Sequence, residues 1–287
     1  MMPLQERYTF IPEFFINHFT KIPLIRKSAK YANVYLSPKS DIKLRVNGFS
    51  MYARTLDRIL ALQLWKLSLH ENYEKRLLKE IVKEKMTVFD IGANIGFYTL
   101  LFAELVGNKG TIYSFEPDPL NYRLLVKNVL VNGYQNVHFI EKAISGTIGE
   151  VKLYLSDEHT GDHRIYDPND GRRSIDVKST TILEVVKETV IPDIIKLDIQ
   201  GSEFLALTNI SHLLNKNKYL KIICEFWPKG MIACGQSPME FLQFLEKCGF
   251  QIFIIDESQS CLRAEGPEKI INYCKGKGYI NLLLKGM

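Results

Sequence analysis

The residues best suited to chemistry are acids that follow short apolar runs. Asp90 stands in the segment VFDIGANIGFYT (88–99), where an apolar run leads into a loop with two glycines. Glu116 comes 26 residues after Asp90, at the end of the next apolar run, and Asp198 ends a later one. Glycines in such a loop let the backbone approach a ligand closely, and ligands bind at the carboxyl ends of parallel strands. The pattern therefore predicts a nucleotide-type site.

The glycine spacing discriminates between two ligands of this type. A dinucleotide site has the pattern G-x-G-x-x-G, but counting from Gly92 puts Asn94 and Phe97 at the second and third glycine positions. The remaining pattern, D-x-G-x-x-x-G, suits a ligand with a ribose and an amino-acid tail but no pyrophosphate, such as S-adenosyl-L-methionine. Glu116 would accept hydrogen bonds from the ribose hydroxyls, as it would with NAD. Taken singly, Asp90 could instead cap a helix and Glu116 could be a solvated turn residue.

Longer motifs make the sequence resemble the FkbM family of S-adenosylmethionine-dependent methyltransferases. The resemblance covers about residues 70 to 285, and these segments carry it: FDIGANIGFYT (89–99), FEP (115–117), AIS (143–145), IKLDIQGSE (195–203), CE (224–225) and NLLL (281–284). The chain departs from the family pattern at Gln200, where the family usually has an acid. No role of that acid is therefore carried over to this chain.

The resemblance implies a role for each matching residue. Asp90, Gly92, Asn94 and Gly96 line the methionine end of the cofactor, and Glu116 its ribose. Ala143 and Ile144 lie at its adenine, and Phe97 is counted with these cofactor-binding residues.

Three residues are candidates for assisting methyl transfer. Transfer from a sulfonium needs mainly alignment and exclusion of water, and a hydroxyl acceptor would also benefit from a base. Asp198 is expected near the transferable methyl group, with helix capping as the alternative. Glu203 follows in a first helical turn, where the helix dipole favours an acid without any catalysis. His163 lies in a long polar loop and is either a general base or a solvated histidine. Lys196 is expected to pair with an acid such as Glu225.

The elements that must position these residues alternate between strand and helix patterns. Strands are expected at 87–90, 111–116, 137–140, 193–198, 219–226, 251–256 and 279–285, and helices at 99–106, 119–132, 181–188, 202–214 and 239–248. This alternation predicts an α/β, Rossmann-like fold. The resemblance specifies the class I methyltransferase sheet, with seven mostly parallel strands and the last antiparallel beside the sixth. Segments 150–156 and 174–179 are expected to form an antiparallel pair of strands in addition to these seven. Gly276 and Gly278 indicate a tight hairpin before the last strand.

The excess positive charge lies in residues 1–50, here called the basic leader, and the rest of the chain has no net charge. Residues 1–50 hold 8 Lys/Arg against 3 Asp/Glu, and residues 51–287 hold 29 of each. This excludes a broadly basic protein that coats nucleic acid. We expect three segments: a basic, aromatic-rich extension (1–50), an amphipathic helical cap (51–85) and a methyltransferase domain (86–287). No apolar run in the leader approaches the roughly 18 to 20 residues that span a bilayer, and the pattern of a signal peptide is missing.

The sequence as a whole predicts a methyltransferase acting on a hydroxyl of a sugar, glycan or natural-product acceptor. The alternatives are a nicotinamide-dependent oxidoreductase and a non-catalytic adaptor with a cofactor pocket. The leader is expected either to pack over the pocket, as a cap or dimer arm, or to lie on an anionic membrane surface near a lipid-linked acceptor. The 5 Cys form no CxxC pair and the 6 His show no ligand spacing. We therefore expect a cytoplasmic protein without a metal site or a nucleic-acid partner, peripheral to the membrane if the second hypothesis holds.

Overall fold

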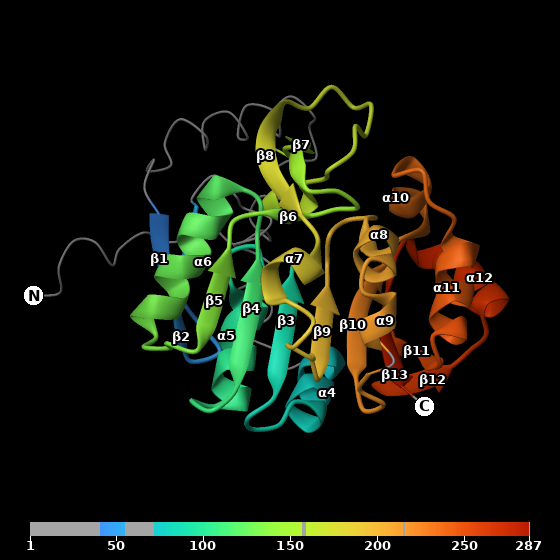
Figure 1. Ribbon diagram of the computed structural model, residues 1–287, viewed down its shortest axis with the longest axis horizontal. Helices are drawn as coiled ribbons and strands as arrows, with labels where there is room; N and C mark the ends of the chain where they lie inside the picture. The colour runs from blue at the N-terminus through green and yellow to red at the C-terminus, as the bar shows by residue number, and fades with distance from the viewer. Residues whose placement is uncertain (1–40, 55–71, 157–158, 215, 287) are drawn as a thin grey trace, which may run out of the picture.

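The computed structural model describes residues 41–54, 72–156, 159–214 and 216–286 (Figure 1). Residues 1–40 of the basic leader and residues 55–71 of the expected helical cap lie outside these ranges. Among the described residues, no helix is both long and apolar enough to cross a bilayer.

A sheet of eight strands forms the centre of the fold. Its order is β12 (Cys261–Ala264), β11 (Phe250–Asp256), β13 (Ile280–Gly286), β10 (Lys221–Phe226), β9 (Ile194–Leu197), β3 (Thr87–Ile91), β4 (Thr111–Phe115) and β5 (Val137–Ile140). The five strands from β10 to β5 are parallel, and β13 lies antiparallel between β10 and β11. This confirms the class I methyltransferase sheet. Strand β12 is an additional eighth strand, short and partly exposed at the edge, so no apolar pattern indicated it.

Helices cover both faces of the sheet (Figure 1). One face packs against α4 (Tyr73–Ile81), α5 (Phe97–Val106) and α6 (Pro119–Val131). The other packs against α7 (Ile182–Val186), α8 (Glu203–Thr208), α9 (Ser211–Leu214), α10 (Pro228–Ala233), α11 (Pro238–Lys247) and α12 (Pro267–Lys277). Successive strand residues point to opposite faces, so Val88 joins the first layer and Phe89 the second. Burial on both faces explains why these strands are mostly apolar in the sequence.

Two expected connections differ in the structure. Gly276 lies inside α12, and Gly278 ends that helix with a φ of 87°. The predicted hairpin before the last strand is therefore wrong, because a helix carries the chain from β12 into the gap between β10 and β11. The single helix expected at 202–214 is two short helices, α8 and α9, separated at Asn209 and Ile210.

The structure before the large sheet also differs from the expected extension (1–50) and helical cap (51–85). Residues 41–54 form a hairpin of β1 (Asp41–Val46) and β2 (Phe49–Arg54), so residues 51–54 of the predicted helical cap are a strand. Every second residue of β2 is buried, as expected for a strand, in which successive side chains point to opposite faces. The Asn128 side chain on α6 exchanges hydrogen bonds with the Tyr52 backbone, and Asn132 does so with that of Ser50. These two side-chain amides thus make hydrogen bonds to the β2 backbone that a neighbouring strand would otherwise make. The described helical part of the cap is α4.

A second small sheet lies above the carboxyl ends of the central strands (Figure 1). It contains β6 (Ala143–Ile144), β8 (Ser174–Thr180) and β7 (Gly149–Tyr154) in that order. Strands β7 and β8 pair antiparallel, which confirms the expected excursion. The connection between them contains a short 3₁₀ helix, η2 (Thr160–Asp162), and holds His163 over the pocket described next.

Candidate active site

A pocket opens at the carboxyl ends of β3 and β9. Strands β4 and β5 follow β3 on one side, and β9 lies on its other side, which makes this the switch point where ligands bind in such sheets. The pocket region holds about 620 Å³ of space between atoms, part of which is open solvent. Seven of the residues singled out from the sequence line it: Gly92, Asn94, Glu116, Ala143, Ile144, His163 and Asp198. Asp90, Gly96, Phe97 and Glu203 are not part of its lining.

The glycine loop after β3 forms the floor of the pocket. The backbone N–H groups of Gly92 and Ala93 both donate to the Phe115 carbonyl, at 3.0 and 2.9 Å, and so tie the loop to the end of β4. Gly92 has a φ of +84°, and a Cβ built on it would lie 2.0 Å from the Asp198 carbonyl oxygen. Glycine is therefore required here, because the loop packs directly against the backbone that follows β9.

Glu116 connects the glycine loop to the segment that leads into α6. Its carboxylate accepts the Asn94 N–H at 2.8 Å through Oε2 and the Asp118 N–H at 2.9 Å through Oε1. Burial raises the pKa of this carboxyl group to about 8. Each carboxylate oxygen has a second acceptor position, and the side chain lines the pocket. Glu116 is only 5% exposed, so it is not a solvated turn residue.

Asp90 lies beneath the loop, fully buried. Its Oδ2 accepts a hydrogen bond from the Thr99 hydroxyl at 2.5 Å, whereas Oδ1 is buried without a hydrogen-bond partner among the described residues. Burial raises the pKa of the Asp90 carboxyl group. Gly96 is the residue before α5, with a φ of 91°, and Phe97 packs into the core. These three residues support the loop from below.

The wall under the small sheet is apolar. Ala143 and Ile144 form β6, are nearly fully buried, and line the pocket together with Phe115, Leu153 and Ile165. This wall can cover a flat, uncharged ring without leaving polar groups unpaired.

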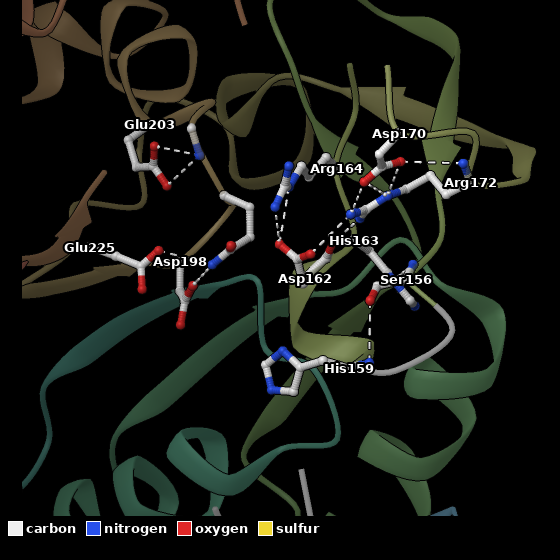
Figure 2. Close-up of polar contacts among 12 residues, drawn as sticks. Ser156, His159, Asp162, His163, Arg164, Asp170, Arg172, Asp198, Glu203 and Glu225 are labelled. Atoms are coloured by element: carbon white, nitrogen blue, oxygen red, sulfur yellow. Dashed lines mark hydrogen bonds and ion pairs between the residues drawn. The ribbon is translucent and has the colours of Figure 1, made fainter. Parts of the chain in front are cut away.

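Charged residues gather at the β9 end of the pocket (Figure 2). The Asp198 side chain is 37% exposed, and its Oδ2 lies 3.3 Å from Nζ of the buried Lys196. The Lys196 ammonium also lies 4.3 Å from the centre of the Tyr98 ring. Burial lowers the pKa of Lys196, but the carboxylates of Asp198, Asp90 and Glu74 outweigh it and the net pKa is raised. Lys196 therefore pairs with an acid, as predicted, but that acid is Asp198 and not Glu225.

Two further residues at this end were not predicted as site residues. The Gln200 side chain donates from Nε2 to Asp198 Oδ1 at 2.9 Å and to Glu225 Oε1 at 3.0 Å. The sequence signals were the departure from the family pattern at Gln200 and the match of the CE segment (224–225) to the family. The contact itself depends on β9 and β10 being neighbours, which no local pattern reveals.

Glu203 has a role different from the predicted catalytic one. Its carboxylate accepts the backbone N–H groups of Ile199 at 3.1 Å and of Gly201 at 3.0 Å, and the side chain is 1% exposed. Figure 2 shows it set apart from the carboxyl groups of Asp198 and Glu225. Burial raises the pKa of Glu203 to about 7. The side chain braces the loop that carries Gln200 and does not reach the pocket.

His163 lines the pocket but has both ring nitrogens occupied. Nδ1 accepts the Ser156 N–H at 3.0 Å, and Nε2 lies 3.7 Å from Asp118 Oδ2. Its side chain is 8% exposed, so it is not a solvated loop histidine. A ring whose Nδ1 accepts from the backbone carries its proton on Nε2, toward a carboxylate. This arrangement docks the loop onto the start of α6 and uses the Nδ1 lone pair for the Ser156 N–H, so the role of His163 as a general base stays a prediction.

The fold and the pocket together define a class I methyltransferase. Residues 90–252 match the methyltransferase FkbM domain, and the chain belongs to this family. This assignment decides against the nicotinamide-dependent oxidoreductase. The family is one of methyltransferases.

Three known proteins illustrate the similarity. An uncharacterized protein of Methanocaldococcus jannaschii is 32% identical over 82 residues, 27% of this chain and 30% of that protein. The hexuronic acid methyltransferase AglP of Haloferax volcanii is 25% identical over 173 residues, 60% of this chain and 66% of that protein. The chain thus matches less than two thirds of the length of either relative. A Streptococcus mutans protein solved in complex with S-adenosylhomocysteine (SAH) has a TM-score of 0.45 at 11% identity, covering 75% of this chain and 96% of that one.

The residues present fit S-adenosylmethionine. The pocket offers a buried carboxyl group at Glu116 and an apolar wall at β6. These are the groups that a ribose and an adenine require, respectively. Asp90, whose Oδ1 is unpartnered among the described residues, supports the glycine loop from beneath and does not line the pocket.

Proposed function

We propose that the chain transfers a methyl group from S-adenosylmethionine to a hydroxyl group of a sugar-like or other small-molecule acceptor. The observation that carries this proposal is the partly exposed carboxylate of Asp198 at the β9 end of the cofactor pocket. A carboxylate at that point can receive the proton of a hydroxyl.

The cofactor would extend along the pocket from β6 to β9. Ala143 and Ile144 would contact the adenine, and Glu116 would accept hydrogen bonds from the ribose hydroxyls. The loop from Gly92 to Asn94 would hold the methionine end. The support for this orientation is the set of residues that line the pocket: an apolar wall at β6, the carboxyl group of Glu116 after β4, and Asp198 after β9.

S-adenosylmethionine supplies a methyl group on a sulfonium, a leaving group that needs no activation. The chain's own residues must therefore align the acceptor and manage one proton. Lys196 holds Asp198 from beneath through its ion pair, and Gln200 holds it from the side. Asp198 would accept the hydroxyl proton as the acceptor oxygen gains the methyl group. Replacing Asp198 by Asn should lower turnover by about 10² or more.

The acceptor class has one further support. The Haloferax relative carries the name hexuronic acid methyltransferase, so a sugar is the acceptor class to test first. The structural argument for a hydroxyl is independent of that relative, because it rests on Asp198 and its two partners.

The test uses S-adenosylmethionine labelled with ¹³C in its methyl group. The full chain is incubated with methyl glycosides of common sugars and, separately, with aliphatic amines, and the products are examined by NMR. We expect a methyl ether signal and stoichiometric SAH. Methylated amine without any methyl ether would overturn the proposal.

A further inference from the structure

Two carboxyl groups lie side by side next to the β9 end of the pocket and are joined by one amide; Asp198 and Gln200 line the pocket, and Glu225 lies beside its lining. Asp198 follows β9 and Glu225 lies near the end of β10, and the register pairs Leu197 with Cys224 directly before them. The Gln200 side chain reaches both, with donor distances of 2.9 and 3.0 Å. Figure 2 shows the two carboxyl groups close together on the same side of the site.

The backbone at Gln200 is shaped for this contact. Its φ is 55°, in the left-handed region that non-glycine residues seldom adopt. The following residue, Gly201, is packed so closely that an added Cβ would lie 2.5 Å from the Gly230 carbonyl carbon. Glu203 binds the backbone N–H groups on either side of Gln200. The loop therefore presents the Gln200 amide in a fixed place.

The two carboxyl groups have unequal electrostatic surroundings. Asp198 has Lys196 at 3.3 Å, whereas no ion pair reaches Glu225 within the described part of the chain. Burial, with the nearby Asp198 and Glu203, raises the pKa of Glu225 to about 9, although Lys196 and the Gln200 amide act in the opposite direction. At neutral pH Glu225 therefore carries a proton that it can donate. One group accepts a hydrogen bond and the other donates one.

We infer that Asp198 and Glu225, held together by Gln200, form the acceptor subsite and that it binds two neighbouring uncharged hydroxyl groups, as on a sugar ring. This inference rests on the proposed function. Asp198 accepts from the hydroxyl that is methylated, and Glu225 donates to the oxygen of its neighbour. The charge at this end excludes a carboxylate at the reacting position. The buried Lys196 is engaged by Asp198, and the Arg164 guanidinium binds Asp162 at 2.5 Å and stacks 4.5 Å from the Trp227 ring.

In this role Gln200 is a positioning residue and Glu225 a binding residue. An acid at position 200 would place a third carboxyl group within hydrogen-bond distance of the other two and would repel Asp198. An amide at position 225 would instead preserve the pattern, since it can accept from Gln200 and still donate to the acceptor.

The experiment measures SAH formation by the full chain with methyl α-glucoside and with methyl α-glucuronoside, from pH 6 to pH 10. The variants are Gln200→Glu, Glu225→Gln and Glu225→Ala. Gln251→Glu, on the exposed side of β11, is the matched control because it makes the same change far from the pocket. Calorimetric titration with SAH is run on each variant.

We expect the wild type to prefer the glucoside. Gln200→Glu and Glu225→Ala should raise the KM for the glucoside by about tenfold or more, well beyond any change in the Kd for SAH. The wild-type KM should rise above pH 9 as Glu225 ionises, and Glu225→Gln should abolish that rise while keeping affinity. A purely structural role would not give this difference in pH profile.

Three results would overturn the inference. The first is an unchanged glucoside KM in Gln200→Glu, and the second is a preference for the glucuronoside. The third is SAH binding by the wild type without turnover of either glycoside, which would remove the sugar assignment but leave methyl transfer to another hydroxyl intact. The proposed function itself fails separately, by methylation of amines alone.

Discussion

Glu203 gives the most quantitative prediction, because its buried carboxyl group couples the active-site loop to pH. Its pKa rises from 4.5 to about 7 through burial, and one pKa unit corresponds to about 1.4 kcal/mol. A raised pKa means that the folded protein holds this proton more tightly than the unfolded chain. The resulting stabilisation is full below pH 4.5 and is lost as pH rises through 7. Between pH 5 and pH 8 the loss is about 2–3 kcal/mol.

Replacing Glu203 by Gln removes this titration. At pH 5 the variant should be less stable by about 1–2 kcal/mol, because an amide satisfies the N–H groups of Ile199 and Gly201 less well than the carboxyl group does. From pH 5 to pH 8 its free energy of unfolding should then fall by about 2–3 kcal/mol less than that of the wild type. Urea titrations followed by circular dichroism at both pH values measure this difference.

The matched control is Glu240→Gln. Glu240 is an exposed acid in the first turn of α11, as Glu203 is an acid in the first turn of α8, so it removes the same charge without the buried contacts. We expect the control to follow the wild type. Parallel pH dependence in the wild type and in Glu203→Gln would refute the assignment of Glu203 as a titrating loop brace.

Three further predictions concern the floor and the loop of the pocket. Gly92→Ala should weaken SAH binding by about tenfold or more in calorimetry, because its Cβ would lie 2.0 Å from the Asp198 carbonyl oxygen. Thr99→Val should lower the free energy of unfolding in urea by about 1–3 kcal/mol, because the buried Asp90 carboxyl group would lose its donor; an unchanged midpoint would contradict this. His163→Ala should lower the thermal midpoint but keep the shape of the pH–rate profile, since both ring nitrogens already face protein groups. Loss of one ionisation from that profile would restore His163 as a base.

The fold was largely predictable because its strands are buried on both faces. The runs that precede Asp90 and Asp198 are mostly apolar, and residues typical of helix starts, such as Pro119, mark the helices between them. Elements that lack such a signal were missed or misassigned. Strand β12 is partly exposed, and β2 is paired by amides from α6.

The site was predictable where it is formed by the loops that follow two successive strands. Gly92, Asn94 and Glu116 come together because β3 and β4 are successive parallel strands. The roles of Glu203 and His163 were not predictable, because they depend on which backbone N–H groups their side chains meet. The contact between Gln200 and Glu225 depends on strand order across the sheet, which the spacing of residues in the sequence does not encode.

The central claim is that S-adenosylmethionine binds in this pocket with Glu116 at its ribose. Calorimetric titration of SAH into the wild type, Glu116→Ala and Glu141→Ala tests it most directly, because Glu141 is an exposed acid near the same rim. We predict micromolar binding by the wild type and by Glu141→Ala, and binding weaker by about tenfold or more in Glu116→Ala. Equal affinity in all three proteins, or binding of NAD in place of SAH, would contradict the account.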